Sequence, residues 1–274
     1  MKNETAIVTG STSGIGKKIA ELFLREGCKV SICSRNENHV NNTLSEFQEE
    51  FGDFIIGFPC DVSDPVALKK LVDKTIETFG SIRILVANAG LSLSYGPFGY
   101  LSLEKVSSEA QIIIGTNLMG VMYSIAAVLP QMIKQKYGRI VTLSGGGADR
   151  PIPNMTIYSA SKGGVVAFSK CLAEEFKERG DDLKINIFHP GMQRTNLTKI
   201  SKIVEGWKAE ETLKHEMDLV LKYVAGDIEE SCSKVIPYVL PTCKSNGNVF
   251  RGFSIMKLIK GFKKLNKAQK QQQL

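Results

Sequence analysis

Paired cysteines and metal-ligating clusters are missing from this 274-residue sequence. The six cysteines, at positions 28, 33, 60, 171, 232 and 243, include no Cys-x-x-Cys pair and no zinc-like spacing. This argues against a disulfide framework and a structural zinc site. We therefore expect reduced, mostly buried thiols and no bound metal.

Long apolar runs are also missing, since none approaches the roughly 20 residues needed to cross a bilayer. The first residues lead into the apolar run Ala6–Val8 without the hydrophobic segment of a secretory signal, so we expect a cytoplasmic protein. The composition, 43% hydrophobic and 23% charged, is that of an ordinary globular chain. No repeat or linker divides it, which predicts one domain over residues 1–256.

Acidic residues are absent from the stretch Lys257–Lys270, which holds six lysines in a chain of net charge +7. We expect residues 257–274 to form a solvated, partly disordered basic tail. Contact with an acidic partner or an anionic membrane is the alternative. The tail has no interleaved aromatic residues for base stacking, so we expect no nucleic-acid partner.

A glycine-rich turn stands near the N-terminus, where the strand-like run Thr5–Thr9 is followed by Gly10, Gly14 and Gly16. An amphipathic helix comes next. A strand, a glycine turn and a helix N-terminus together form a site for a pyrophosphate. The alternative is a tight turn without a ligand.

The second predicted strand, 29–33, ends at Ser34, Arg35 and Asn36. An arginine here suits a ribose 2′-phosphate, because the guanidinium is always charged and offers forked donors. NADP(H) is therefore the expected cofactor and NAD(H) is possible. The alternative is that Arg35 only stacks on adenine or points into solvent. Position 13 is a serine, so a second basic ligand for the phosphate is missing there.

The rest of the chain alternates between predicted strands and helices, which indicates an α/β fold with one doubly wound parallel sheet of seven strands. Residues 91–108 are predicted to form a loop at the rim of the site. Residues 192–226 form an amphipathic insertion of the length that a substrate lid needs. The further strands are expected at 55–58, 82–87, 139–143, 184–188 and 248–253, and the further helices at 37–50, from Pro65, at 109–135, 155–179 and 228–239.

Tyr158 and Lys162 lie four residues apart, one turn apart on one helix face. An ammonium beside a phenol lowers the tyrosine pKa, which lets the hydroxyl donate or accept a proton. Alone, such a pair is more often a surface contact. Asn117, inside a predicted helix, either satisfies neighbouring backbone or holds a water near this pair. Asp61, just past a strand, either binds adenine or caps the next helix, a role that suits Asp64 better.

These motifs together resemble the short-chain dehydrogenase/reductase family over residues 3 to 255. They stand in the family's order: Thr9-Gly10-x3-Gly14-Ile15-Gly16, Asp61-Val62, Asn88-Ala89-Gly90, Asn117, Tyr158-x3-Lys162 and Pro190-Gly191-x3-Thr195. The resemblance implies an NAD(P)(H)-dependent Rossmann-fold enzyme acting on carbonyl or alcohol groups.

The resemblance also implies roles for individual residues. Tyr158 would be the acid/base, Lys162 would lower its pKa and hold the nicotinamide ribose, and Asn117 would position a relay water. The implied cofactor-binding residues are Gly10, Ser11, Ser13, Gly14, Ile15, Gly16, Ser34, Arg35, Asn36, Asp61, Val62, Asn88, Ala89, Gly90, Tyr158, Lys162, Pro190, Gly191, Met192 and Thr195.

One position departs from the family pattern. The family's serine, thirteen residues before the tyrosine, is Gly145 here, and Ser144 lies one residue earlier. A hydroxyl is wanted there to hydrogen-bond the substrate oxygen as it becomes charged. Ser144 is the candidate fourth catalytic residue if the triple glycine lets it swing inward. The alternative is a strand-end hydroxyl bonded to the backbone.

Two functions remain in competition. The first is an NADP(H)-dependent oxidoreductase acting on a small carbonyl or alcohol substrate. The second is a catalytically weak dinucleotide-binding or scaffold protein, suggested by Gly145 and the basic tail. The long helices 109–135 and 155–179 are the faces that this family commonly pairs, so we expect a homodimer or homotetramer.

Overall fold

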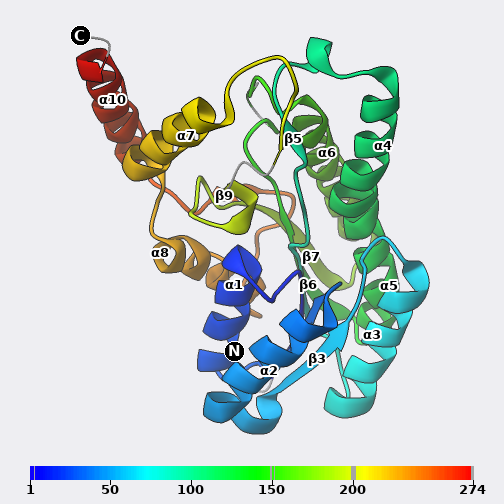
Figure 1. The fold of residues 1–274 in the computed structure, drawn as a ribbon. Coiled ribbons are helices and arrows are strands. Elements are labelled where there is room, and N and C mark those ends of the chain that lie inside the picture. Colours follow the sequence, from blue (N-terminus) through cyan, green and yellow to red (C-terminus); the bar gives the residue numbers. More distant parts are fainter. Residues whose placement is uncertain (3, 149, 151, 199–201, 273–274) are drawn as a thin grey trace.

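The computed structural model describes residues 1–2, 4–148, 150, 152–198 and 202–272. Within them, seven parallel strands form one sheet in the order β3-β2-β1-β4-β6-β7-β9 (Figure 1). This confirms the predicted doubly wound α/β architecture. The strands are β1 (Thr5–Thr9), β2 (Lys29–Ser34), β3 (Ile55–Pro59), β4 (Ile84–Ala87), β6 (Tyr137–Leu143), β7 (Asp182–His189) and β9 (Val249–Arg251).

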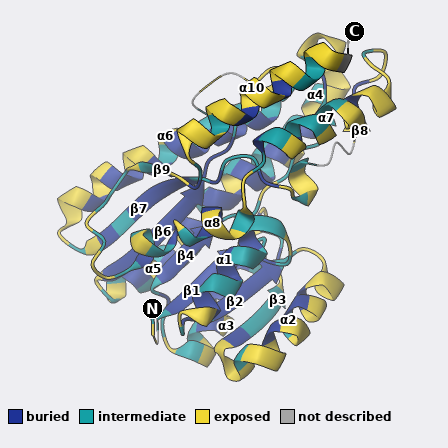
Figure 2. Cartoon of the chain, turned by 90° about the vertical axis from the view of Figure 1, so that its left-hand side faces the viewer, coloured by how far each residue is buried: buried dark blue, intermediate teal, exposed yellow. Residues whose placement is uncertain are grey.

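Helices cover both faces of the sheet because alternate residues of each strand are apolar on opposite sides. On β1, Ala6 and Val8 face one helical layer and Ile7 faces the other. Figure 2 shows the strands as a buried layer between exposed helices. The first layer holds α1 (Gly14–Arg25), α2 (Glu37–Phe51), α8 (Ile228–Ser233) and α9 (Ile236–Val239), and the second holds α3 (Pro65–Phe79), α5 (Gly120–Lys134) and α6 (Thr156–Arg179).

The helix that carries Asn117 begins earlier than the sequence predicted. α4 (Leu103–Ile114) starts six residues before the expected 109, because Ser102 caps it by accepting from the Lys105 N–H at 3.2 Å. A π-helical turn, Gly115–Met119, joins it to α5. The prediction of a rim loop over 91–108 was therefore wrong for residues 103–108.

By length and composition alone, the helical run Leu103–Lys134 could cross a membrane, because an 18-residue window within it has a mean hydropathy of 1.9. The expectation that no such stretch exists was wrong. In the fold, α5 packs on α3 and on strands β4 and β6, and α4 packs on α6. Burial against these elements accounts for part of the apolar composition, since 44% of that window is buried.

The predicted lid segment contains a short 3₁₀ turn (Asn196–Thr198), β8 (Lys202–Ile203) and α7 (Glu210–Val224), while residues 199–201 lie outside the described part. β8 pairs in parallel with β5 (Ser94–Tyr95). The rings of Tyr95 and Trp207 lie 5.8 Å apart. The segment is thus joined to the rim of the site.

The C-terminal residues were expected to be a partly disordered tail, and this expectation was wrong. They form α10 (Ile255–Gln272), which packs on α7 (Figure 1). Leu265 is 4% exposed in that contact, so burial of apolar surface holds the helix against the body. The predicted helix 228–239 is instead split into α8 and α9, and Pro237 stands in the first turn of α9.

Candidate functional site

The glycine-rich turn is held in place by Asn88, which follows β4. Its side-chain amide donates to the Thr9 carbonyl at 2.8 Å and to the Gly10 carbonyl at 3.0 Å. Gly10 has φ +63°, and a Cβ there would lie 2.8 Å from the Ala89 Cα. A Cβ on Gly16 would overlap the Gly10 carbonyl. Glycine is therefore required where the turn, β4 and α1 meet.

The turn fits a dinucleotide pyrophosphate at the N-terminus of α1. Ser13, the N-cap, makes no side-chain capping bond, and the first turn of α1 carries no acidic side chain. The N–H groups at this positive helix end suit an anion. Thr195 lies across the turn, since a Cβ on Gly14 would be 3.1 Å from its methyl carbon. Gly14 and Thr195 thus lie together, and Ile15 follows within the first turn of α1. Their roles in cofactor binding stay predictions.

Ser11 and Val62, which we had predicted to contact the cofactor, are packed inside the fold. Ser11 is fully buried, and its hydroxyl donates to the Val8 carbonyl at 2.6 Å and accepts from the Cys33 N–H at 3.0 Å. Val62 is buried, and a Cβ on Gly120 would lie 2.6 Å from its methyl group. Both side chains therefore have structural contacts, and their roles in cofactor binding stay predictions.

The residues after β2 and β3 lie on adjacent strand ends, where an adenosine half would sit. Arg35 is exposed directly after β2. Asn36 caps α2 by accepting from the His39 N–H at 3.1 Å, and Ser34 accepts from the Asn36 N–H at 3.3 Å. Of these three residues, Arg35 alone has an exposed cationic side chain, which suits a phosphate.

The Asp61 carboxylate accepts from the Ser63 N–H at 2.9 Å and from its hydroxyl at 2.7 Å. Asp64 accepts from the Val66 N–H at 2.8 Å and caps α3, as predicted. Because Asp64 fills the cap, Asp61 is not needed for it. The carboxylate of Asp61 remains partly exposed at the strand end.

Tyr158 and Lys162 are both buried on α6. The Lys162 ammonium donates to the Leu143 carbonyl, at the end of β6, at 3.0 Å. It lies 6.0 Å from the centroid of the Tyr158 ring. Burial lowers the pKa of Lys162 to about 8 and raises the pKa of Tyr158 to about 12. The expected lowering of the tyrosine pKa is therefore reversed, because loss of hydration favours the neutral phenol.

Asn117 lies in the π-helical turn and is fully buried. Its amide oxygen accepts from the Leu91 N–H at 2.8 Å, and its amide nitrogen donates to the Leu91 carbonyl at 2.9 Å. The same nitrogen donates to the Ser161 hydroxyl at 3.0 Å. A Cβ on Gly90 would lie 3.2 Å from the Asn117 oxygen and 3.4 Å from the Lys162 ammonium. Asn117 thus joins the end of β4 to α6, and its role in holding a water stays a prediction.

Ser144 faces away from the tyrosine. It is 3% exposed, and its hydroxyl lies 3.4 Å from the Phe188 carbonyl on β7. Its N–H donates to the same carbonyl at 2.9 Å, which continues the pairing of β6 with β7. Successive strand residues face opposite sides, so this register aims Gly145 at the site instead. The prediction of Ser144 as a catalytic residue is corrected to a backbone-bonded hydroxyl.

The Pro190–Gly191 turn after β7 lies against Phe253, two residues after the end of β9. Gly191 has φ +76°, and a Cβ there would lie 2.8 Å from the Phe253 ring. The Met192 carbonyl accepts from the Gly226 N–H at 3.0 Å, which ties the start of the lid segment to its end. This turn lies at the carboxyl edge of the sheet, where the glycine-rich turn and the end of β6 also lie.

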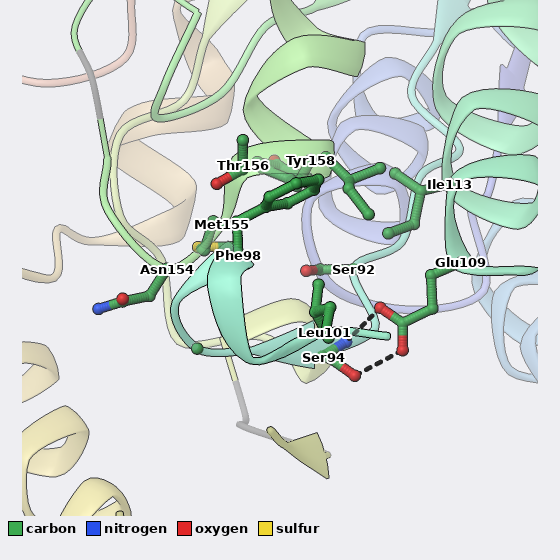
Figure 3. Close-up of a pocket in the computed structure, with 12 residues that line it drawn as sticks. Ser92, Ser94, Phe98, Leu101, Glu109, Ile113, Asn154, Met155, Thr156 and Tyr158 are labelled. Atoms are coloured by element: carbon green, nitrogen blue, oxygen red, sulfur yellow. Dashed lines mark hydrogen bonds between the residues drawn. The ribbon is translucent and has the colours of Figure 1, made fainter. Parts of the chain in front are cut away.

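A pocket lies beside Tyr158, between the 91–101 segment and α4 (Figure 3). Its walls mix apolar side chains such as Phe98 and Ile113 with polar ones such as Ser92. Glu109 is 4% exposed, with its carboxylate bonded to the Ser94 hydroxyl and 3.1 Å from the Lys105 ammonium. Sequence reasoning missed Glu109. The sequence did contain a signal for it, since Glu109 is a carboxylate on the inward side of a mostly apolar helix.

Comparison with known proteins agrees with this geometry. The family model described as short chain dehydrogenase matches residues 4–203. An uncharacterized oxidoreductase of Staphylococcus saprophyticus is 33% identical over 72% of this chain and 82% of its own. Human very-long-chain 3-oxoacyl-CoA reductase is 35% identical over 73% of this chain, which spans 62% of that protein. The structure of a variant actinorhodin polyketide ketoreductase with NADPH has a TM-score of 0.77 and 28% identity, covering 90% of this chain and 95% of that one.

Proposed function

The chain belongs to the short chain dehydrogenase family, and we propose that it is an NADP(H)-dependent carbonyl reductase in which Tyr158 supplies the proton. The observation that carries the proposal is the position of Tyr158. Its side chain lines the pocket and lies on the same helix as Lys162, at the sheet edge that holds the glycine-rich turn.

The bound nicotinamide would supply the hydride that reduces the carbonyl carbon. Residues of this chain would hold the nucleotide. The N–H groups of the glycine-rich turn would bind the pyrophosphate, and Arg35 would bind the ribose 2′-phosphate. The solved ketoreductase contains NADPH, which supports a nicotinamide dinucleotide as the cofactor of this chain. The exposed guanidinium of Arg35 supports NADP(H) over NAD(H).

Tyr158 would donate its hydroxyl proton to the substrate oxygen as negative charge grows there. A pKa of about 12 keeps the phenol protonated at neutral pH, which suits the reducing direction. Lys162, with a pKa near 8, remains largely charged at neutral pH and favours the phenolate that is left behind. Asn117 would hold the Leu91 peptide and so fix the wall of the pocket.

The substrate is proposed to be a carbonyl on a largely apolar body. Phe98, Leu101 and Ile113 line the pocket beside Tyr158. The names of two relatives, a 3-oxoacyl-CoA reductase and a polyketide ketoreductase, favour ketones within acyl chains. The chain spans only part of the first of these, so the acyl carrier is not specified by that likeness.

The test is turnover of a carbonyl panel by the purified protein, followed by the loss of dihydronicotinamide absorbance. The panel should include 3-oxoacyl thioesters, diketones and aldehydes, each with NADPH and with NADH. We expect NADPH-dependent reduction of at least one ketone. Tight NADPH binding without turnover of any substrate would contradict the proposal and favour a dinucleotide-binding protein.

A further inference from the structure

We propose that α10 docks on the surface of an anionic lipid bilayer. The helix is basic and amphipathic, with six lysines and no acidic residue between Ile255 and Gln272. It is fixed on the body of the protein and exposes apolar side chains. The proposal does not depend on the oxidoreductase activity.

The orientation of α10 is set by its contact with α7. Leu265 is buried there and Leu258 is half-buried. Gly261 is also buried, and a Cβ on it would overlap the Tyr223 carbonyl, so the two helix backbones touch. These three residues are spaced to lie on one side of the helix. The opposite sides must therefore face outward.

An exposed apolar stripe runs along the first turns of α10. Ile255, Ile259 and Phe262 are spaced four and three residues apart and share one face, with exposures of 56%, 50% and 45%. Met256, beside them, is 72% exposed. Four large apolar side chains gathered on one helix mark a binding surface more strongly than scattered ones. Figure 2 shows α10 at the edge of the molecule with its outward side exposed.

The lysines lie next to this stripe and are largely free of ion pairs. Lys257 is paired with Glu230 at 2.9 Å. The other five form no ion pair with any residue in the described part of the chain. They are Lys260, Lys263, Lys264, Lys267 and Lys270, and all are exposed. Apolar side chains beside unpaired cations on one helix are suited to a membrane interface. The apolar side chains insert into the lipid, and the lysines contact the anionic headgroups.

A second copy of α10 fits this surface less well. The apolar stripe ends at Phe262, and the next positions on that face are Asn266 and Gln269. A helix pair needs apolar residues repeated over several heptads, which two turns do not provide. Five unpaired lysines on each helix would also repel one another. A bilayer requires no such repeat, and it attracts every lysine at once.

Docking here would place the lid segment beside the lipid. α10 packs on α7, and Phe253, two residues before α10, lies 5.1 Å from the His189 ring and covers Gly191. The first turn of α10 is thus joined to the turn after β7 that borders the proposed cofactor site.

The experiment is sedimentation of the full chain with lipid vesicles. Phosphatidylcholine vesicles are compared with vesicles containing about 30% phosphatidylserine, which carry a negative surface potential. We expect binding to the anionic vesicles, little binding to the neutral ones, and loss of binding at about 1 M salt, where charges are screened.

Two double variants separate the contributions of the apolar stripe and of the lysine charges to vesicle binding. Ile259→Ser with Phe262→Ser tests the stripe, and Lys263→Glu with Lys267→Glu tests the charge. Each should lower the apparent vesicle affinity at least about fivefold. The matched controls are Leu103→Ser with Ile112→Ser, which removes exposed apolar residues of α4, and Lys69→Glu with Lys74→Glu on α3. Both controls should bind like the wild type.

Several results would overturn the proposal. They are no binding to anionic vesicles, equal binding to both kinds of vesicle, or equal losses in the α10 variants and their controls. A dimer detected by light scattering that Phe262→Ser abolishes, without vesicle binding, would assign the surface to a second copy. A thermal melt of each variant confirms that it is folded.

Discussion

The hydroxyl of Tyr158 occupies space that any side chain on residue 145 would need. A Cβ built on Gly145 would lie 2.5 Å from the Tyr158 hydroxyl oxygen and 3.3 Å from the ring carbon that bears it. The glycine that replaces the family's serine is therefore part of how this tyrosine fits. While Tyr158 keeps this orientation, there is no room for a side-chain hydroxyl on residue 145.

Gly145→Ala should accordingly lower turnover. The added methyl must displace the Tyr158 hydroxyl, and a shift of about 1 Å in a reacting group can cost up to about 100-fold. We expect at least a tenfold loss of kcat with unchanged NADPH affinity. Gly163→Ala is the control, since a Cβ there meets nothing within 4 Å. Unchanged turnover in the Gly145 variant would mean that the tyrosine is not held as described.

Lys162→Met should remove a pH dependence of stability. Burial holds the pKa of Lys162 at about 8, below its ordinary 10.5, so the unfolded chain carries more protons between these values. Relative to Lys162→Met, the wild type should therefore gain free energy of unfolding as pH rises across that window, by up to about 3 kcal/mol. The comparison with the variant is needed because burial also raises the pKa of the Cys28 and Cys232 thiols, which lowers the stability of both proteins alike above about pH 9. From about pH 10 to 12 stability should fall again, because the raised pKa of Tyr158 keeps its proton in the folded state.

The measurement is urea unfolding of the cofactor-free protein at about pH 7 and pH 9.5, below the titration of Tyr158. Over this interval the unfolding free energy of the wild type should rise relative to that of Lys162→Met. Only the change in unfolding free energy between the two pH values is compared. The variant also loses the hydrogen bond to Leu143, but this loss lowers its unfolding free energy equally at both pH values. The same change with pH in both proteins would show that Lys162 is hydrated when the chain is folded.

Arg35→Asp should reverse the choice of cofactor. A charge-assisted bond to the 2′-phosphate is worth about 1.5–3 kcal/mol, and a carboxylate would repel that phosphate. The ratio of NADPH to NADH affinity, measured by fluorescence titration, should fall at least tenfold. Arg179→Asp, at the far end of α6, should leave the ratio as it is. An unaltered ratio in the Arg35 variant would remove the 2′-phosphate assignment.

Motif order alone placed most of this site at one sheet edge. Parallel strands bring their carboxyl ends together, so Gly10 after β1, Asn88 after β4 and Pro190 after β7 had to lie near one another. The spacing of Tyr158 and Lys162 likewise fixed both on one face of α6. Periodicity and glycine spacing predicted the strands, the glycine-rich turn and the Tyr158–Lys162 pair, whereas the roles of Asn88 and Pro190 came from the family resemblance.

Other features depended on tertiary contacts that local sequence does not carry. Loss of hydration, which raises the pKa of Tyr158, exists only once α6 is packed against the sheet. The direction of the Ser144 side chain follows from pairing with Phe188 on β7, which is the neighbouring strand in the sheet but lies 44 residues later in the sequence. α10 is ordered by burying Leu265 on α7, whereas its lysine-rich composition alone suggested a solvated tail.

The central claim is that Tyr158 supplies the proton, and Tyr158→Phe tests it most directly. The measurement is single-turnover reduction of a ketone identified in the panel, with saturating NADPH and with Tyr123→Phe on α5 as the control. We predict a 10²–10⁴-fold slower reduction step, as is usual when an acid/base is removed, with NADPH affinity unchanged. A rate near that of the wild type would contradict the account.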